Sequence, residues 1–173
     1  MSCNPPYMEN GEDSLDVWLT TISADQAKID EYLSNSGLLK NKRVLHVGCG
    51  QSSVAYRFHS QFTHADGIAI WKNEVKLGND LNLDNYNCYE VDKYMLDQLS
   101  VLGTYDVIID NNIKSYMCCQ EHYEDWFGWM LDNSSIIITH DLGMRSRSIL
   151  SDADIDKAGG FVDKLSNGVV LIT

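Results

Sequence analysis

The chain has 173 residues, 44% of them hydrophobic, which predicts a globular domain with a buried core. It carries 25 Asp and Glu residues against 13 Lys and Arg, a formal net charge of −12, and no basic run, which disfavours sequence-independent binding to nucleic acid. The sequence shows neither a long apolar run nor a secretory signal, and its five cysteines form no CxxC pair, so we expect a reducing, cytoplasmic compartment without a membrane partner or a zinc ribbon.

Helix and strand patterns alternate after a polar N-terminus. We expect residues 1–13, which hold both prolines, to be flexible and residues 14–173 to form one domain. Ser23, with Gln26 in the capping-box position, predicts the start of a helix that ends at Gly37. The following segments predict a strand at 43–47, a helix at 52–62, a strand at 63–70, a short helix or turn at 72–80 and a strand at 86–91.

The second half continues the alternation and ends differently. It predicts a helix at 93–103, a strand at 105–110, a helix at 115–132 and a strand at 134–140. Asn167-Gly168 then predicts a hairpin turn between two final strands. The order indicates a three-layer αβα sandwich, a Rossmann-like α/β fold whose sheet of about seven strands is parallel except for an antiparallel C-terminal hairpin.

The sequence "HVGCGQSS" follows the first predicted strand and is the first candidate binding loop. Gly48 and Gly50 allow a sharp turn and a close approach of the backbone to a ligand, and Ser52 or Ser53 is placed to cap the next helix. A dinucleotide fingerprint would have glycine at Ser53 and an acid near Ala69, so NAD binding is disfavoured.

The arrangement resembles class I S-adenosylmethionine (SAM) dependent methyltransferases, on three motifs and the closing hairpin. "VLHVGCGQSS" is similar to the first motif of that family, "CYEVDKYML" to the third-strand motif and "YDVIIDNNI" to the fourth-strand motif. The resemblance implies SAM as cofactor, S-adenosylhomocysteine as product, and a cofactor site made of His46, Gly48, Cys49, Gly50, Ser52, Ser53, Trp71, Val91, Asp92 and Asp110.

The resemblance also implies a role for individual positions. The residues from Gly48 to Gly50 would line the methionine and ribose parts of SAM, Asp92 with Val91 would meet the adenine, and Asp110 would approach the methionine ammonium or the acceptor. Trp71 is a candidate for stacking on the ribose or adenine. Two positions depart from the family pattern, because His46 and Ala69 stand where acids are usual.

Candidate catalytic groups follow the fourth and fifth predicted strands. His140, next to Asp141, is a candidate general base, and Asp110, Asn111 and Tyr116 are placed to orient an acceptor, together with Asn112. A magnesium site made of Asp110, Asn111 and Asp141 is an alternative, but the acid–amide pair follows the fourth strand here and the fifth strand in catechol-type enzymes. We therefore predict no metal ligands.

The leading functional hypothesis is methyl transfer to an oxygen or nitrogen of a small molecule. A non-catalytic module that binds SAM or a protein partner is a second hypothesis, since His46 and Ala69 replace two acids. Another SAM-consuming reaction on the same fold is a third. The prolines of the DNA amino-methyltransferase signature are absent after the fourth strand, and the sequence leaves open whether the chain forms a homo-oligomer.

Overall fold

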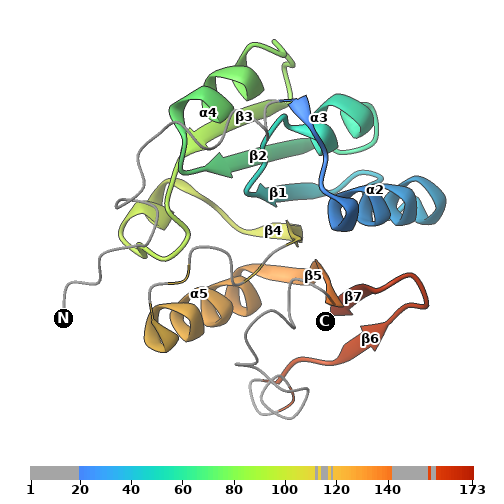
Figure 1. The fold of residues 1–173 in the computed structure, drawn as a ribbon, viewed down its shortest axis with the longest axis vertical. Helices are drawn as coiled ribbons and strands as arrows, with labels where there is room; N and C mark the ends of the chain where they lie inside the picture. Colours follow the sequence, from blue (N-terminus) through green and yellow to red (C-terminus); the bar gives the residue numbers. More distant parts are fainter. Residues whose placement is uncertain (1–19, 112, 114–116, 118, 142–155, 157–158) are drawn as a thin grey trace.

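A seven-stranded sheet runs through the structure, a computed structural model that describes residues 20–111, 113, 117, 119–141, 156 and 159–173 (Figure 1). The strand order is β3-β2-β1-β4-β5-β7-β6. The pairs that join β3, β2, β1, β4 and β5 are parallel, whereas β7 is antiparallel to β5 and to β6. The strands are β1 (Arg43–Val47), β2 (His64–Ala69), β3 (Tyr86–Glu90), β4 (Tyr105–Asp110), β5 (Ser134–His140), β6 (Val162–Lys164) and β7 (Val169–Ile172). The predicted fold class is confirmed.

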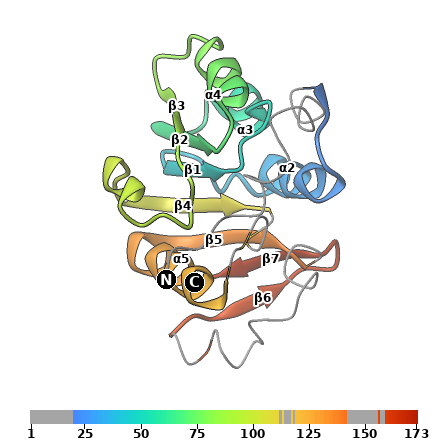
Figure 2. The same ribbon diagram turned by 60° about the vertical axis from the view of Figure 1, so that its left-hand side comes forward.

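Helices cover both faces of this sheet (Figure 2). One face carries α2 (Ala24–Ser36), α3 (Ser53–Phe58) and α4 (Lys72–Asn79). The other carries the 3-10 helix η3 (Gln98–Val101) and α5 (Gln120–Asn133). In the described part of the chain, no helix is both long enough and apolar enough to cross a membrane.

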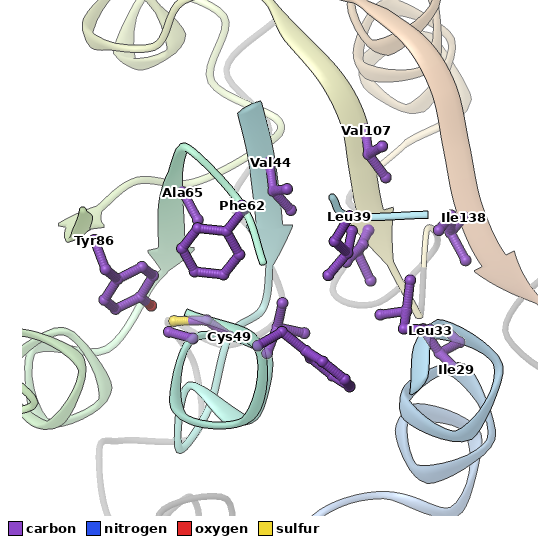
Figure 3. Packing of buried hydrophobic residues seen from close by; sticks show 14 of the residues in the cluster. Ile29, Leu33, Leu39, Val44, Cys49, Phe62, Ala65, Tyr86, Val107 and Ile138 are labelled. Carbon is purple, nitrogen blue, oxygen red and sulfur yellow. The ribbon is translucent and has the colours of Figure 1, made fainter. Parts of the chain in front are cut away.

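Alternating side chains of the central strands build the two halves of the core. Ile108 of β4 packs with Trp126 of α5, whereas its neighbours Val107 and Ile109 pack on the opposite face. All of them are completely buried, as expected for a parallel strand covered on both sides. Figure 3 shows the face covered by α2, α3 and α4, where Val107 lies in the same cluster as Leu33 of α2.

Local sequence signals set the ends of α2 and of the terminal hairpin. The Ser23 side chain accepts a hydrogen bond from the backbone N–H of Gln26 at 3.3 Å, and Gly37 ends the helix with a φ of 64°. In the hairpin, Gly168 has a φ of 88°, and Asn167 accepts from the N–H of Val169 at 3.2 Å. Both predictions are confirmed, since each signal acts within a few residues of the turn it makes.

Three predicted helices differ from the structure. The helix predicted at 52–62 ends at Phe58. The segment 93–103 forms turns followed only by η3, and the helix predicted at 115–132 begins at Gln120. The backbone after β3 follows interior contacts instead, because the Lys93 ammonium binds Asp110 and the Tyr94 hydroxyl donates to the carbonyl of Ile113 at 2.7 Å. Tertiary contacts therefore override the apolar spacing of that segment. The predicted flexible N-terminus, residues 1–13, lies outside the described residues.

Candidate active site: a cavity at the carboxyl ends of β1 to β4

A cavity of about 350 Å³ opens where β1, β2, β3 and β4 end. The sheet order reverses between β1 and β4, and this switch point is where ligands bind in open α/β sheets. The segment from Thr21 to Gln26 closes part of the cavity from the N-terminal side. Most of the predicted site residues line it, namely Gly48, Cys49, Gly50, Ser53, Trp71, Val91, Asp92, Asp110 and Asn111.

The loop after β1 owes its shape to its two glycines. Gly48 and Gly50 have φ angles of 62° and 51°, in the left-handed region that favours glycine. Between them, the backbone N–H of Cys49 donates to the carbonyl of Ile68 at the end of β2, at 3.1 Å. This bond ties the loop to the neighbouring strand and presents the backbone of the loop to the cavity.

The segment after β3 fixes a carboxylate at the cavity wall. Asp92 is buried, and its Oδ1 atom accepts a hydrogen bond from the backbone N–H of Tyr94 at 3.0 Å. Its own N–H donates to the Gln98 side chain at 2.9 Å. The orientation of Asp92 is thus set locally by the turn that replaces the predicted helix.

A buried ion pair crosses the far wall of the cavity. The Lys93 ammonium lies 2.9 Å from Oδ2 of Asp110, and the indole N–H of Trp126 donates to the same oxygen at 3.1 Å. The side chains of Lys93 and Asp110 are 9% and 2% exposed, so water screens the pair weakly. Burial lowers the pKa of Lys93, and the neighbouring Asp110 carboxylate opposes that shift.

Glu74 is a cavity residue that the sequence patterns did not reveal. It lies in the first turn of α4, lines the cavity and is 6% exposed. Burial raises the pKa of its carboxyl to about 7. The only available signal was an acid in the first turn of the helix after β2, five positions beyond Ala69, where the usual acid was missing. Three more residues line the cavity although the sequence patterns did not indicate them as site residues, namely Asp25, Gln26 and Lys93.

Two predicted cofactor residues, His46 and Ser52, do not line the cavity. His46 is buried within β1, 3.3 Å from the side-chain oxygen of Gln26, and burial lowers its pKa to about 4, so the ring is neutral at pH 7. It supports Gln26, which does reach the cavity. Ser52 occupies the N-cap position of α3, but its hydroxyl bonds to the Tyr86 hydroxyl at 2.8 Å instead of capping the helix.

Two predicted catalytic residues, His140 and Asp141, also lie outside the cavity lining. His140 is 2% exposed, and its Nε2 atom lies 3.3 Å from the carbonyl of Asn167 in the hairpin turn. The absence of a side chain at Gly168 makes room for this ring, because a Cβ there would lie 2.8 Å from Nε2. The backbone N–H of Asp141 donates to the Gly168 carbonyl at 2.8 Å. Both residues therefore meet the hairpin.

Other predicted groups also have defined places. Asn111 lines the cavity, and its amide donates to the Ser23 hydroxyl at 3.1 Å, which joins the end of β4 to the start of α2. Tyr116 and Asn112 lie outside the described residues. Asp66, the acid before Ala69, accepts from the Tyr105 hydroxyl at 2.8 Å and does not line the cavity. Among the side chains that the structure describes, no group of three or more His, Cys, Asp and Glu is arranged to hold a metal ion.

Comparison with solved structures identifies this architecture. The N-methyltransferase NodS from Bradyrhizobium japonicum WM9, in complex with S-adenosyl-L-homocysteine, superposes with a TM-score of 0.65 at 11% identity, over 92% of this chain and 94% of that chain. Magnesium protoporphyrin IX methyltransferase from Synechocystis PCC 6803, with bound SAM, gives 0.65 at 14% identity, over 93% and 89%.

A third similar structure is that of an enzyme named for a protein substrate. It is the ribosomal protein L11 methylase from Lactobacillus delbrueckii subsp. bulgaricus, with a TM-score of 0.59 at 12% identity, over 87% of this chain and 78% of that chain. The chain has the class I methyltransferase fold. By sequence, the chain matches no protein-family model and no curated protein.

Proposed function

We propose that this protein is a SAM-dependent methyltransferase. The observation that carries the proposal is the cavity beside the loop from Gly48 to Gly50, at the switch point of a class I methyltransferase sheet. Its volume of about 350 Å³ falls within the range of roughly 300–1,000 Å³ usual for small-molecule sites.

The charge of the cavity wall supports a cationic ligand. Four acids line the cavity, Asp25, Glu74, Asp92 and Asp110, against the single cation Lys93 among the described lining residues. SAM carries a sulfonium and an ammonium group as well as one carboxylate. Negative charge in a partly enclosed, low-dielectric site favours such a ligand over an anionic nucleotide.

Each part of the cofactor has a proposed neighbour. The backbone of the glycine loop meets the methionine and ribose parts, and Asp92 accepts from the adenine amino group beside Val91. Trp71, at the start of α4, covers the ribose or adenine. Glu74 accepts hydrogen bonds from the ribose hydroxyls in place of the acid that is usual at the position of Ala69. It can do so because it lines the same cavity from the first turn of α4.

Methyl transfer requires mainly alignment from the protein. When bound, SAM supplies an activated methyl group and its leaving group. Asp110, held by Lys93 and Trp126, fixes the methionine end, and Asn111 orients the acceptor beside it. Proximity and orientation of this kind account for a large share of the rate in reactions between two bound molecules.

We propose a small molecule as the acceptor and the cytoplasm as the compartment. The cavity is bordered by Thr21, Ser23 and Asn111, whose hydroxyl and amide groups suit a compact polar acceptor. The net charge of −12 works against a nucleic-acid acceptor.

A second candidate is a module that binds SAM without transferring its methyl group. It is favoured by the position of His140, the predicted base, which packs on the hairpin and does not line the cavity. Methyl transfer to an acceptor that needs no base is consistent with the same observation, so only a product assay separates the two candidates.

Calorimetry tests the cofactor assignment, with SAM and S-adenosylhomocysteine as ligands and NAD as the matched control. We expect both SAM compounds to bind and NAD to give no heat. The absence of heat and of a thermal shift at millimolar SAM would refute the proposal. Mass spectrometry with a panel of phenols, amines and carboxylates then identifies the product: S-adenosylhomocysteine supports methyl transfer, whereas methylthioadenosine indicates a different SAM-consuming reaction.

A further inference from the structure

Two free thiols meet at the edge of the cavity. Cys49 lies in the glycine loop and Cys88 in β3, and their Sγ atoms are 3.4 Å apart. Each residue is only 4% exposed, and Cys49 lines the cavity. Figure 3 shows the Cys49 side chain directed from the loop toward Tyr86, the first residue of β3.

The strand between them has no side chain at the point where the thiols meet. Gly67 of β2 is the register partner of Cys88, and a Cβ at Gly67 would lie 3.3 Å from the Cys49 sulfur and 2.1 Å from the Tyr86 hydroxyl. On the helix above, a Cβ at Gly78 of α4 would lie 2.8 Å from the Cys88 Cβ. Because Gly67 and Gly78 have no side chains, the sulfurs of Cys49 and Cys88 have room to come into contact.

The two sulfurs are also chemically distinct. Either thiol can be the donor in the contact between the two sulfurs, and this contact raises the pKa of one thiol and lowers that of the other. A lowered pKa increases the thiolate fraction, and the thiolate is the reactive form in oxidation. The pair therefore offers one reactive thiolate beside a second thiol that can resolve its oxidised form, and Cys49 is the member that lines the cavity.

We propose that Cys49 and Cys88 form a reversible disulfide that controls access of the cofactor to the cavity. The oxidant is hydrogen peroxide or another small peroxide that enters through the cavity. The thiolate of one cysteine attacks one peroxide oxygen, the O–O bond breaks and, after protonation, water leaves, so that this cysteine becomes a sulfenic acid. The sulfur of the other cysteine then displaces the hydroxyl group, which leaves as a second water molecule. In sum, two thiols are oxidised and one peroxide is reduced.

The geometry determines which part of the protein moves. The sulfurs, in contact but unbonded, must come closer to form a covalent bond. Cys88 is held in a strand that pairs with β2, whereas Cys49 lies between two glycines with positive φ. The displacement therefore falls on the loop that lines the cavity. The resulting loss of cofactor affinity rests on the proposed function, but the disulfide itself does not.

The experiment uses a background variant with Cys3→Ser, Cys118→Ser and Cys119→Ser, which keeps only the proposed pair. After treatment with peroxide, we expect the intact mass to fall by two hydrogen atoms and dithiothreitol to restore it. Adding Cys88→Ser to this background is the matched control and abolishes that mass change. In the wild-type protein, peptide mapping after alkylation must show a peptide that links Cys49 to Cys88, which covers the case in which the background variant does not fold.

Calorimetry with SAM completes the test. Oxidation of the background variant should weaken SAM binding by about tenfold or more, and reduction should restore it. If both thiols remain alkylatable after peroxide, the disulfide is refuted, whatever the ligand. If the disulfide forms and the affinity stays unchanged, its control of the cavity is refuted. If the reduced protein does not bind SAM, the proposed function fails, while the mass measurement still decides the disulfide.

Discussion

Replacing Lys93 by methionine tests the buried ion pair at the cavity wall. The change keeps most of the side-chain volume and removes the ammonium that faces Asp110 at 2.9 Å. Removal of one partner of a buried pair costs about 3–5 kcal/mol, because the other charge stays buried without compensation. The indole N–H of Trp126 still donates to Asp110, and a hydrogen bond to a charged group contributes about 1.5–3 kcal/mol. We therefore expect the lower end, a loss of about 3 kcal/mol in the free energy of unfolding.

Urea unfolding at pH 7, followed by circular dichroism, measures this loss. The Asp110→Asn variant and the double variant complete a cycle, in which the double variant should be less destabilised than the sum of the single changes. Lys76→Met is the matched control, since Lys76 pairs with Asp80 on the exposed side of α4 and should have little measurable effect. A loss below about 1 kcal/mol for Lys93→Met would show that water reaches the pair and would refute the reasoning.

Three further predictions each concern one residue, namely Asp92, Glu74 and His140. Asp92→Asn should weaken SAM binding about tenfold, because one charge-assisted hydrogen bond is lost. The control Asp97→Asn, at an exposed position, should leave the affinity unchanged. Equal SAM affinities of Asp92→Asn and the wild type in calorimetry would contradict the adenine assignment. Burial raises the pKa of Glu74 from 4.5 to about 7, so between these values the folded protein holds a proton that the unfolded chain has released. The free energy of unfolding of the wild type, relative to that of Glu74→Gln, should therefore fall as the pH rises from 4.5 to about 7. Since a cationic ligand favours the ionised carboxylate, SAM affinity should rise between about pH 6 and about pH 8 in the wild type but not in Glu74→Gln; parallel pH profiles would exclude Glu74 from the cofactor site. His140→Gln should keep the methyl-transfer rate within about threefold, because the ring packs on the hairpin, and a drop of about a hundredfold would restore His140 as the base.

Only part of the candidate site could be predicted from the sequence. The glycine loop and Asp92 followed from motif order, because each lies directly at the end of a predicted strand. His140 also follows a strand, yet the hairpin that packs against it decides where its ring lies. A residue's place at a strand end therefore predicts its edge of the sheet and not the direction of its side chain.

The sequence by itself determined the order of the strands along the chain, the antiparallel hairpin at Asn167-Gly168 and the turn at Gly48 and Gly50. These features depend on apolar periodicity and on backbone angles within a few residues, which local sequence encodes. Only the tertiary structure decided that Lys93 pairs with Asp110, that Glu74 lines the cavity and that Cys49 meets Cys88. Those contacts join segments brought together by packing across the sheet, and no pattern within either segment specifies the other.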